Sequence, residues 1–184
     1  MGIQFRVAAS VEKGMICMIK KLIIALTLLA LPAQASEVAF SPYGGAEALV
    51  LRTILSAHKS VHIAAYSFTS KPISYALIEA RSRGVDVWVV ADESNMSSPH
   101  AITATLIRAG IPVHYSGCYK IQHNKFMVID GRVVQTGSFN YSKAAAKSNS
   151  ENVIVFDDIS LAAEYGAEWQ RLWAESSAGG ECVR

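Results

Sequence analysis

The segment HNKFMVIDGRVVQTGSFN, residues 123–140, contains the clearest structural signal in the chain. Residues 125–129 and 133–136 are runs of mostly apolar and β-branched side chains, which is typical of strands. Asp130 and Gly131 stand between the two runs, and an Asp-Gly pair favours the tight turn of a β-hairpin. The segment therefore predicts two antiparallel strands joined at this turn.

Polar side chains gather at the open end of this predicted hairpin. His123 and Lys125 are two residues apart, as are Ser138 and Asn140, so each pair shares one face of an extended segment. His123 and Ser138 both lie about seven residues from the turn, which brings the two pairs together. This set suits a phosphodiester, because a cation neutralises the non-bridging oxygens and neutral donors orient them. The imidazole is then free to attack phosphorus or to move protons.

Two carboxylates near the hairpin have different expected roles. Asp130 is seven residues from His123, an odd spacing that puts the two on opposite faces of a regular strand. We therefore expect Asp130 to support the hairpin rather than to touch substrate. Glu151 precedes the next predicted strand, from which it could reach the site. A carboxylate bonded to the far imidazole nitrogen would fix the tautomer and stabilise a charged intermediate.

Helices and strands alternate before the hairpin, which favours an α/β sandwich. We expect a mixed, mostly parallel central sheet flanked by helices. Predicted strands outside the hairpin cover residues 37–40, 61–68, 85–91, 111–115 and 152–156, and predicted helices cover residues 46–57, 71–83, 99–109 and 159–174.

Taken together, the polar residues resemble the HKD motif block of the phospholipase D superfamily. The likeness runs unbroken over residues 123–152, and the strand end at residues 65–68 is also similar to the family. It covers most of the chain after residue 35 and is strongest with the small exported bacterial endonucleases of that superfamily. The matching elements are His123-x-Lys125-x4-Asp130-Gly131, Gly137-Ser138-x-Asn140 and Glu151-Asn152.

The resemblance implies a phospholipase D-like sandwich and a two-step mechanism that needs neither a metal nor a cofactor. His123 would attack phosphorus and form a phosphohistidine. A second histidine would protonate the leaving oxygen and then activate water. The implied roles are catalytic for His123, Lys125 and Glu151, phosphate-binding for Lys125, Ser138 and Asn140, and structural for Asp130, Gly131 and Gly137.

One copy of this motif is only half of such a site, because the mechanism needs two histidines facing one phosphate. The histidines at positions 58, 62, 100 and 114 are not followed by the rest of the pattern. The roughly 149 residues after position 35 are too few for a second domain of this kind. We therefore expect a homodimer with a shared active site, in which the two-fold axis brings together one His123 from each chain.

Three functions are compatible with this set of residues. The first is a non-specific endonuclease acting on single- and double-stranded DNA, with RNA left open, because nothing resembles a base-reading helix. The alternative is a phospholipase D or phosphatidyl-transfer enzyme, which would use the same chemistry but shows no lipid-facing amphipathic segment. The third is a non-catalytic phosphate- or nucleic-acid-binding module, which would have no need of His123 and Glu151.

The N-terminal residues predict export. Residues 18–35 contain two lysines, an apolar run over residues 22–31 and a small-residue end, the three parts of a signal peptide. The run is too short to span a membrane, and a buried helix is the less favoured interpretation. Residues 1–17 are interpreted as an over-extended start. We expect cleavage after Ala35, leaving residues 36–184 as a single phospholipase D-like nuclease domain, periplasmic or secreted, without a stable membrane anchor.

Processing would also change the charge and the cysteine count. The chain has a formal net charge of +2, but residues 36–184 keep 13 basic and 14 acidic side chains, a net of −1. Attraction for phosphates must then come from a local patch. Cys118 and Cys182 would form a disulfide or remain as two free thiols. His114 together with Cys118 offers too few ligands for a metal site.

Overall fold

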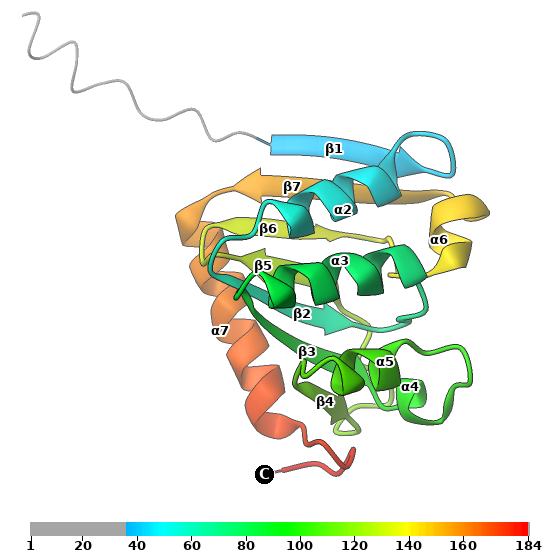
Figure 1. Cartoon of the computed structure of the whole chain (residues 1–184), viewed down its shortest axis with the longest axis vertical. Coiled ribbons are helices and arrows are strands. Elements are labelled where there is room, and N and C mark those ends of the chain that lie inside the picture. The colour runs from blue at the N-terminus through cyan, green and yellow to red at the C-terminus, as the bar shows by residue number, and fades with distance from the viewer. Residues whose placement is uncertain (1–35, 184) are drawn as a thin grey trace, which may run out of the picture. The chain divides into compact units, whose positions relative to one another are not determined.

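A seven-stranded sheet forms the centre of the domain in the computed structural model, which describes residues 36–183 (Figure 1). The predicted signal peptide and the segment before it lie outside the described residues. The strand order is β1-β7-β6-β5-β2-β3-β4. The strands are β1 (Ser36–Ser41), β2 (Ser60–Ala65), β3 (Asp86–Asp92), β4 (Val113–Ser116), β5 (Lys125–Ile129), β6 (Val133–Gly137) and β7 (Glu151–Asp157).

The predicted α/β class and the mixed sheet flanked by helices are confirmed, but the expectation of a mostly parallel sheet is wrong. Strand β2 pairs in parallel with β3, and β3 with β4. The other four neighbouring pairs, β1 with β7, β7 with β6, β6 with β5 and β5 with β2, are antiparallel. Parallel pairing needs a crossover, and helices provide one only between β2 and β4, whereas β5 and β6 are joined by a tight hairpin.

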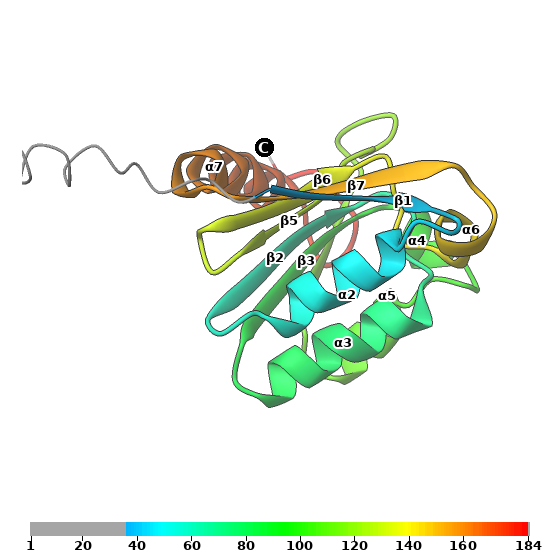
Figure 2. The same ribbon diagram turned by 90° about the horizontal axis from the view of Figure 1, so that it is seen from above.

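Helices cover both faces of the sheet (Figure 2). Helix α7 lies on one face, and α2, α3 and α5 lie on the other. The predicted helix over residues 99–109 is shorter in the structure, and the short helices α4 and α6 were not predicted because a single turn carries no apolar period. The helices are α2 (Ala46–Leu55), α3 (Lys71–Ser82), α4 (Ser94–Ser97), α5 (Thr103–Arg108), α6 (Lys143–Lys147) and α7 (Ile159–Glu175).

Alternate side chains of the central strands enter two separate cores. Ile63 and Met127 pack toward α2 and α3, whereas Phe126 and Val128 pack toward α7. In the second core Trp169 is 4% exposed, and its indole stacks on the His62 ring with centroids 4.3 Å apart. None of the helices within residues 36–183 has the length and apolar character needed to cross a membrane.

The predicted hairpin between β5 and β6 is present in the structure. Asp130 and Gly131 have φ angles of 54° and 63°, so both central residues of the turn over residues 129–132 are left-handed. Three residues, 130–132, connect the paired ends Ile129 and Val133. The Arg132 N–H donates to the Ile129 carbonyl at 3.0 Å and closes the turn. The register pairs Phe126 with Thr136, which sets residues 123–125 opposite residues 137–139.

Candidate active site

A hollow of about 530 Å³ opens at the end of the sheet where β5 begins and β6 ends. All five of the side chains predicted to act on a phosphate line it, although they come from three separate segments of the chain. Those five are His123, Lys125, Ser138, Asn140 and Glu151, and the remaining lining residues are Asn124, Phe126, Thr136, Gly137 and Tyr165.

The Lys125 ammonium is held inside this hollow. Lys125 is 8% exposed, and its Nζ donates to the His123 carbonyl oxygen at 2.6 Å. Nζ also lies 5.2 Å from the centre of the Tyr66 ring, within range of a cation–π contact. Burial lowers the pKa of Lys125, and the charge of Glu151 partly opposes this effect. The result is a fixed cation that is poorly hydrated and well suited to an anionic ligand.

Glu151, at the start of β7, is tied to the end of β6. Its Oε2 accepts a hydrogen bond from Ser138 Oγ at 2.6 Å, and its Oε1 accepts from Asn149 Nδ2 at 2.9 Å. Ser138 Oγ in turn accepts from the Asn152 N–H at 3.1 Å. The structure thus brings Glu151 to the same hollow as His123 but directs its hydrogen bonds to Ser138 and Asn149, so the expected contact with the imidazole stays a prediction.

Gly137 allows this close approach of β6 to β7. Its φ is +144°, and a Cβ at this position would lie 2.3 Å from the Asn152 carbonyl oxygen. Real Cβ atoms do not come that near to backbone oxygen, so any side chain here would push the strands apart. Three residues later, the Asn140 Oδ1 is buried and has no hydrogen-bond partner among the described residues. The Asn140 side chain lines the hollow, although its Oδ1 atom is itself inaccessible.

Asp130 lies at the far end of the hairpin, away from the hollow. Its carboxylate accepts hydrogen bonds from the backbone N–H groups of His58, Lys59 and Ser60, at 3.0, 2.7 and 2.9 Å. Burial opposes ionisation, but these three N–H donors and the nearby His58 outweigh it and lower the pKa of Asp130. Asp130 thus joins the hairpin to the start of β2, a position that agrees with the structural role expected from strand parity.

Sequence reasoning missed the residues that surround His123. The Tyr66 ring lies 4.6 Å from the imidazole centroid, and the Tyr66 carbonyl accepts from Asn95 Nδ2 at 2.6 Å. Asp92 is 3% exposed and accepts from the Gln122 N–H at 2.7 Å, directly before the histidine. Only Tyr66 carried a signal, as part of the strand end that resembles the family. Asp92 is the last residue of β3 and Asn95 follows that strand, outside the part of the sequence that showed the likeness.

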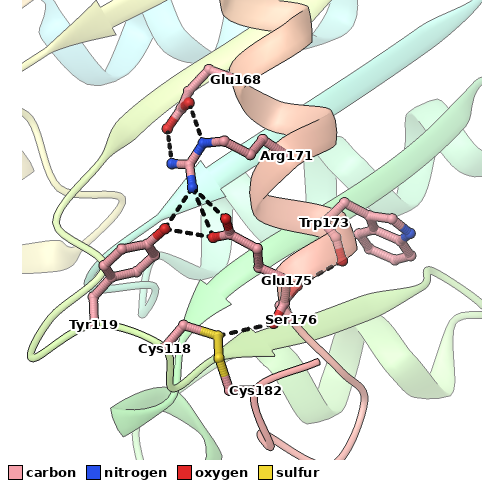
Figure 3. A network of polar contacts seen from close by, with 8 residues as sticks. All are labelled: Cys118, Tyr119, Glu168, Arg171, Trp173, Glu175, Ser176 and Cys182. Atoms are coloured by element: carbon pink, nitrogen blue, oxygen red, sulfur yellow. Dashed lines mark hydrogen bonds and ion pairs between the residues drawn. A yellow bond between two sulfur atoms is a disulfide. The ribbon is translucent and has the colours of Figure 1, made fainter. Parts of the chain in front are cut away.

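The loop that leads to His123 is also fastened to the C-terminal segment (Figure 3). Cys118 and Cys182 form a disulfide with an S–S distance of 1.96 Å, which decides between the two alternatives that the sequence left open. Beside it, the Arg171 guanidinium on α7 donates to the Tyr119 hydroxyl and to both oxygens of Glu175. The loop therefore has a covalent and a polar anchor within five residues of His123.

Comparison with known proteins agrees with this geometry. Residues 50–173 match the family model described as "Cardiolipin synthase, PLD-like domain". The chain is 39% identical over 130 residues to a phospholipase D of Rickettsia bellii and 35% identical over 126 residues to a mitochondrial cardiolipin hydrolase of Xenopus laevis. These alignments cover 71% and 68% of this chain, and 65% and 60% of the relatives, a little under two thirds of their length.

Two solved structures share the fold over nearly their whole length. Nuc from Salmonella typhimurium, a phospholipase D family member, is 40% identical with a TM-score of 0.75, and the match covers 78% of this chain and 96% of Nuc. NucT from Helicobacter pylori is 28% identical with a TM-score of 0.72, and the match covers 78% of this chain and 98% of NucT. The fold that holds the hollow is therefore the fold of these two proteins.

Proposed function

The chain belongs to the phospholipase D superfamily, and on this premise we propose that it is a metal-independent phosphodiesterase that cleaves DNA through a phosphohistidine. The observation that carries the proposal is the convergence of His123, Lys125, Ser138, Asn140 and Glu151 on one hollow. A buried cation, a hydroxyl and an amide around an imidazole form a site for an anionic phosphodiester that is about to be attacked.

The chemistry proceeds in two displacements at phosphorus. An imidazole nitrogen of His123 attacks, the P–N bond forms, and the bond to the leaving oxygen breaks as a second histidine gives that oxygen its proton. The second histidine, now neutral, takes a proton from water. The water oxygen then attacks phosphorus, the P–N bond breaks, and His123 is regenerated. Lys125 balances the charge that collects on the non-bridging oxygens in both steps.

The second histidine comes from a second copy of the chain. Within residues 36–183, His123 is the one histidine that lines the hollow. Val38 and Phe40 on edge strand β1 are each 56% exposed, and they follow the antiparallel register beside Ile154 and Asn152 of β7. An exposed apolar edge near the site suits a two-fold contact that places two copies of His123 around one phosphate.

DNA is the proposed substrate because the domain matches two small proteins over nearly their whole length. The match spans 96% of Nuc and 98% of NucT, in line with the single-domain size of the small endonucleases that the sequence resembles. Phospholipid remains the second candidate, since the relatives named for phospholipase D and cardiolipin hydrolase are 39% and 35% identical. Export to the periplasm or the medium is proposed on the predicted signal peptide at residues 18–35.

One assay tests the reaction. The protein is incubated with plasmid DNA, single-stranded DNA and a phosphatidyl substrate in excess EDTA, beside His123→Ala and a matched His58→Ala control. We expect DNA cleavage that His58→Ala retains and His123→Ala loses. Hydrolysis of the phosphatidyl substrate alone would transfer the assignment to phospholipid, and activity that requires added Mg²⁺ would contradict the mechanism. Binding of DNA without any cleavage would reduce the protein to a binding module.

A mixing experiment tests the shared site. Wild-type and His123→Ala chains are unfolded together, refolded at varied ratios and assayed at constant total protein. If each site needs both histidines, activity follows the square of the wild-type fraction, so an equal mixture keeps about a quarter of the activity. A linear decline, with about half of the activity kept, would show that each chain acts alone.

A further inference from the structure

A second hollow, of about 720 Å³, lies outside the catalytic set. It is formed by the start of α3, the turn before α5 and the first residue of α6. Its lining residues are Thr69, Lys71, Ser74, Tyr75, Pro99, His100, Ala101, Ile102, Thr105 and Lys143. None of these side chains is one of the matching motif residues named above or has a part in the proposed reaction.

The second hollow is joined to the first by a short, fixed piece of backbone. Asn140 lines the first hollow and Lys143 lines the second, so at most about 11 Å of chain separates them. Between them, the Tyr141 carbonyl accepts from the N–H groups of Thr69 and Ser70, both at 2.9 Å. The Tyr141 side chain is fully buried against Phe68, with ring centroids 5.6 Å apart. The two hollows therefore hold a constant spacing at one end of the sheet.

The chemistry of the second hollow suits a nucleic acid strand. Lys71, His100 and Lys143 are exposed, and among the lining residues, all within the described range, there is no Asp or Glu. Tyr75, one turn along α3 from Lys71, is 63% exposed. Cations beside an uncovered aromatic ring are the combination that binds single strands, since the cations pair with phosphates and the ring stacks on a base.

We propose that this second hollow binds a single-stranded stretch of DNA next to the bond that is cleaved. Lys71 and Lys143 pair with phosphates that flank the one at His123, and Tyr75 stacks on an unpaired base. The proposal rests on the proposed nuclease function. It deepens that function by specifying single-stranded DNA, because stacking on Tyr75 requires an unpaired base. A phospholipid headgroup offers no base, so it would leave the ring unused.

Binding is measured in the His123→Ala background, so that cleavage does not interfere. Fluorescence anisotropy of a labelled oligothymidylate is followed against salt concentration for Lys71→Ala/Lys143→Ala, Tyr75→Ala and Tyr75→Phe, with Lys59→Ala as the exposed-lysine control. The double lysine variant should lower the slope of log K against log salt by about 0.7 for each phosphate that is no longer neutralised. Tyr75→Ala should weaken binding by about tenfold or more, whereas Tyr75→Phe keeps the ring and the affinity.

Cleavage assays then test the role of the second hollow separately from the nuclease function on which it rests. In the otherwise wild-type chain, Tyr75→Ala should lower kcat/KM for single-stranded DNA more than for duplex DNA. If the wild-type protein cuts DNA in EDTA but none of these variants changes binding, salt slope or strand preference, the second hollow is not a DNA site and the nuclease assignment stands. If the variants weaken binding to cardiolipin vesicles and leave oligothymidylate binding unchanged, the hollow serves a lipid headgroup and the inference is overturned.

Discussion

The hydroxyl of Ser138 donates a 2.6 Å hydrogen bond to the carboxylate of Glu151, which joins the end of β6 to the first residue of β7. Both residues line the hollow that contains His123 and Lys125. Ser138 Oγ also accepts from the Asn152 N–H at 3.1 Å, so the orientation of the hydroxyl is fixed. The hydrogen bond holds the Glu151 carboxylate at the site. The negative charge of this carboxylate raises the pKa of the buried Lys125 ammonium.

Replacing Glu151 with Gln should remove that charge and keep the shape. We expect kcat to fall by about a hundredfold or more, because a positively charged histidine intermediate loses its counter-charge. Glu151 raises the pKa of Lys125 against the lowering effect of burial, so the variant should also shift the basic limb of the pH–rate profile to lower pH. The measurement is kcat across the pH range from acid to alkaline solution. Glu79→Gln, a surface carboxylate paired with Arg83, should leave the profile unchanged.

Asp130→Ala should affect stability rather than chemistry. Its carboxylate accepts three backbone N–H groups, and their loss should reduce the free energy of unfolding by about 2 to 4 kcal/mol at neutral pH. The pKa of Asp130 is lowered in the folded protein, so this stability is present above about pH 4 and is lost as the pH falls through the folded pKa. The free energies of unfolding from urea titrations at neutral pH and at about pH 3 should therefore differ less for Asp130→Ala than for the wild-type protein. Asp157→Ala, which breaks an exposed pair with Arg132, should cost much less stability than Asp130→Ala.

Reduction of the Cys118–Cys182 disulfide should loosen the loop that carries His123. The two cysteines are 64 residues apart in sequence, and closing such a loop stabilises a fold by about 2 to 4 kcal/mol. We expect dithiothreitol to lower both Tm and kcat in the wild-type protein. The Cys118→Ser/Cys182→Ser variant should have the lower Tm and kcat even without reductant, and dithiothreitol should change neither. Unchanged kcat in that variant would mean that the contacts of Tyr119 with Arg171 and Glu175 hold the loop alone.

His62 should make the domain less stable in mild acid. Burial against Trp169 lowers the pKa of His62, and Asp86 only partly opposes this. The unfolded chain therefore takes up a proton first, so stability is full above about pH 6.5 and falls as the pH drops toward the folded pKa. In denaturant titrations from about pH 7.5 to about pH 5, His62→Phe should lose less stability than wild type. His100→Gln, at an exposed histidine, should behave as wild type does.

Local pattern was enough to place the hairpin and to predict which of its residues gather at one hollow. A period of two residues and an Asp-Gly turn predict which side chains share a face. Asp130 itself lies in the turn, at the end of the hairpin away from the hollow, and its carboxylate is bonded to the start of β2. The same local rules could not give the direction of β1 or β7 in the sheet. That direction depends on which strands meet over long separations, and the expectation of a mostly parallel sheet failed at these strands.

The order and spacing of the residues from 123 to 151 thus predicted which side chains gather at one hollow, because strand geometry and a tight turn leave few alternatives. The surroundings of His123 arose from contacts between distant parts of the chain. Tyr66 and Asp92 reach the histidine segment from the ends of β2 and β3, and Cys182 reaches it from the C-terminal end. The second hollow, with Lys71 and Lys143, likewise exists only where the start of α3, the turn before α5 and the start of α6 come together. No local spacing encodes such meetings, since they are set by how the two helical layers pack on the sheet.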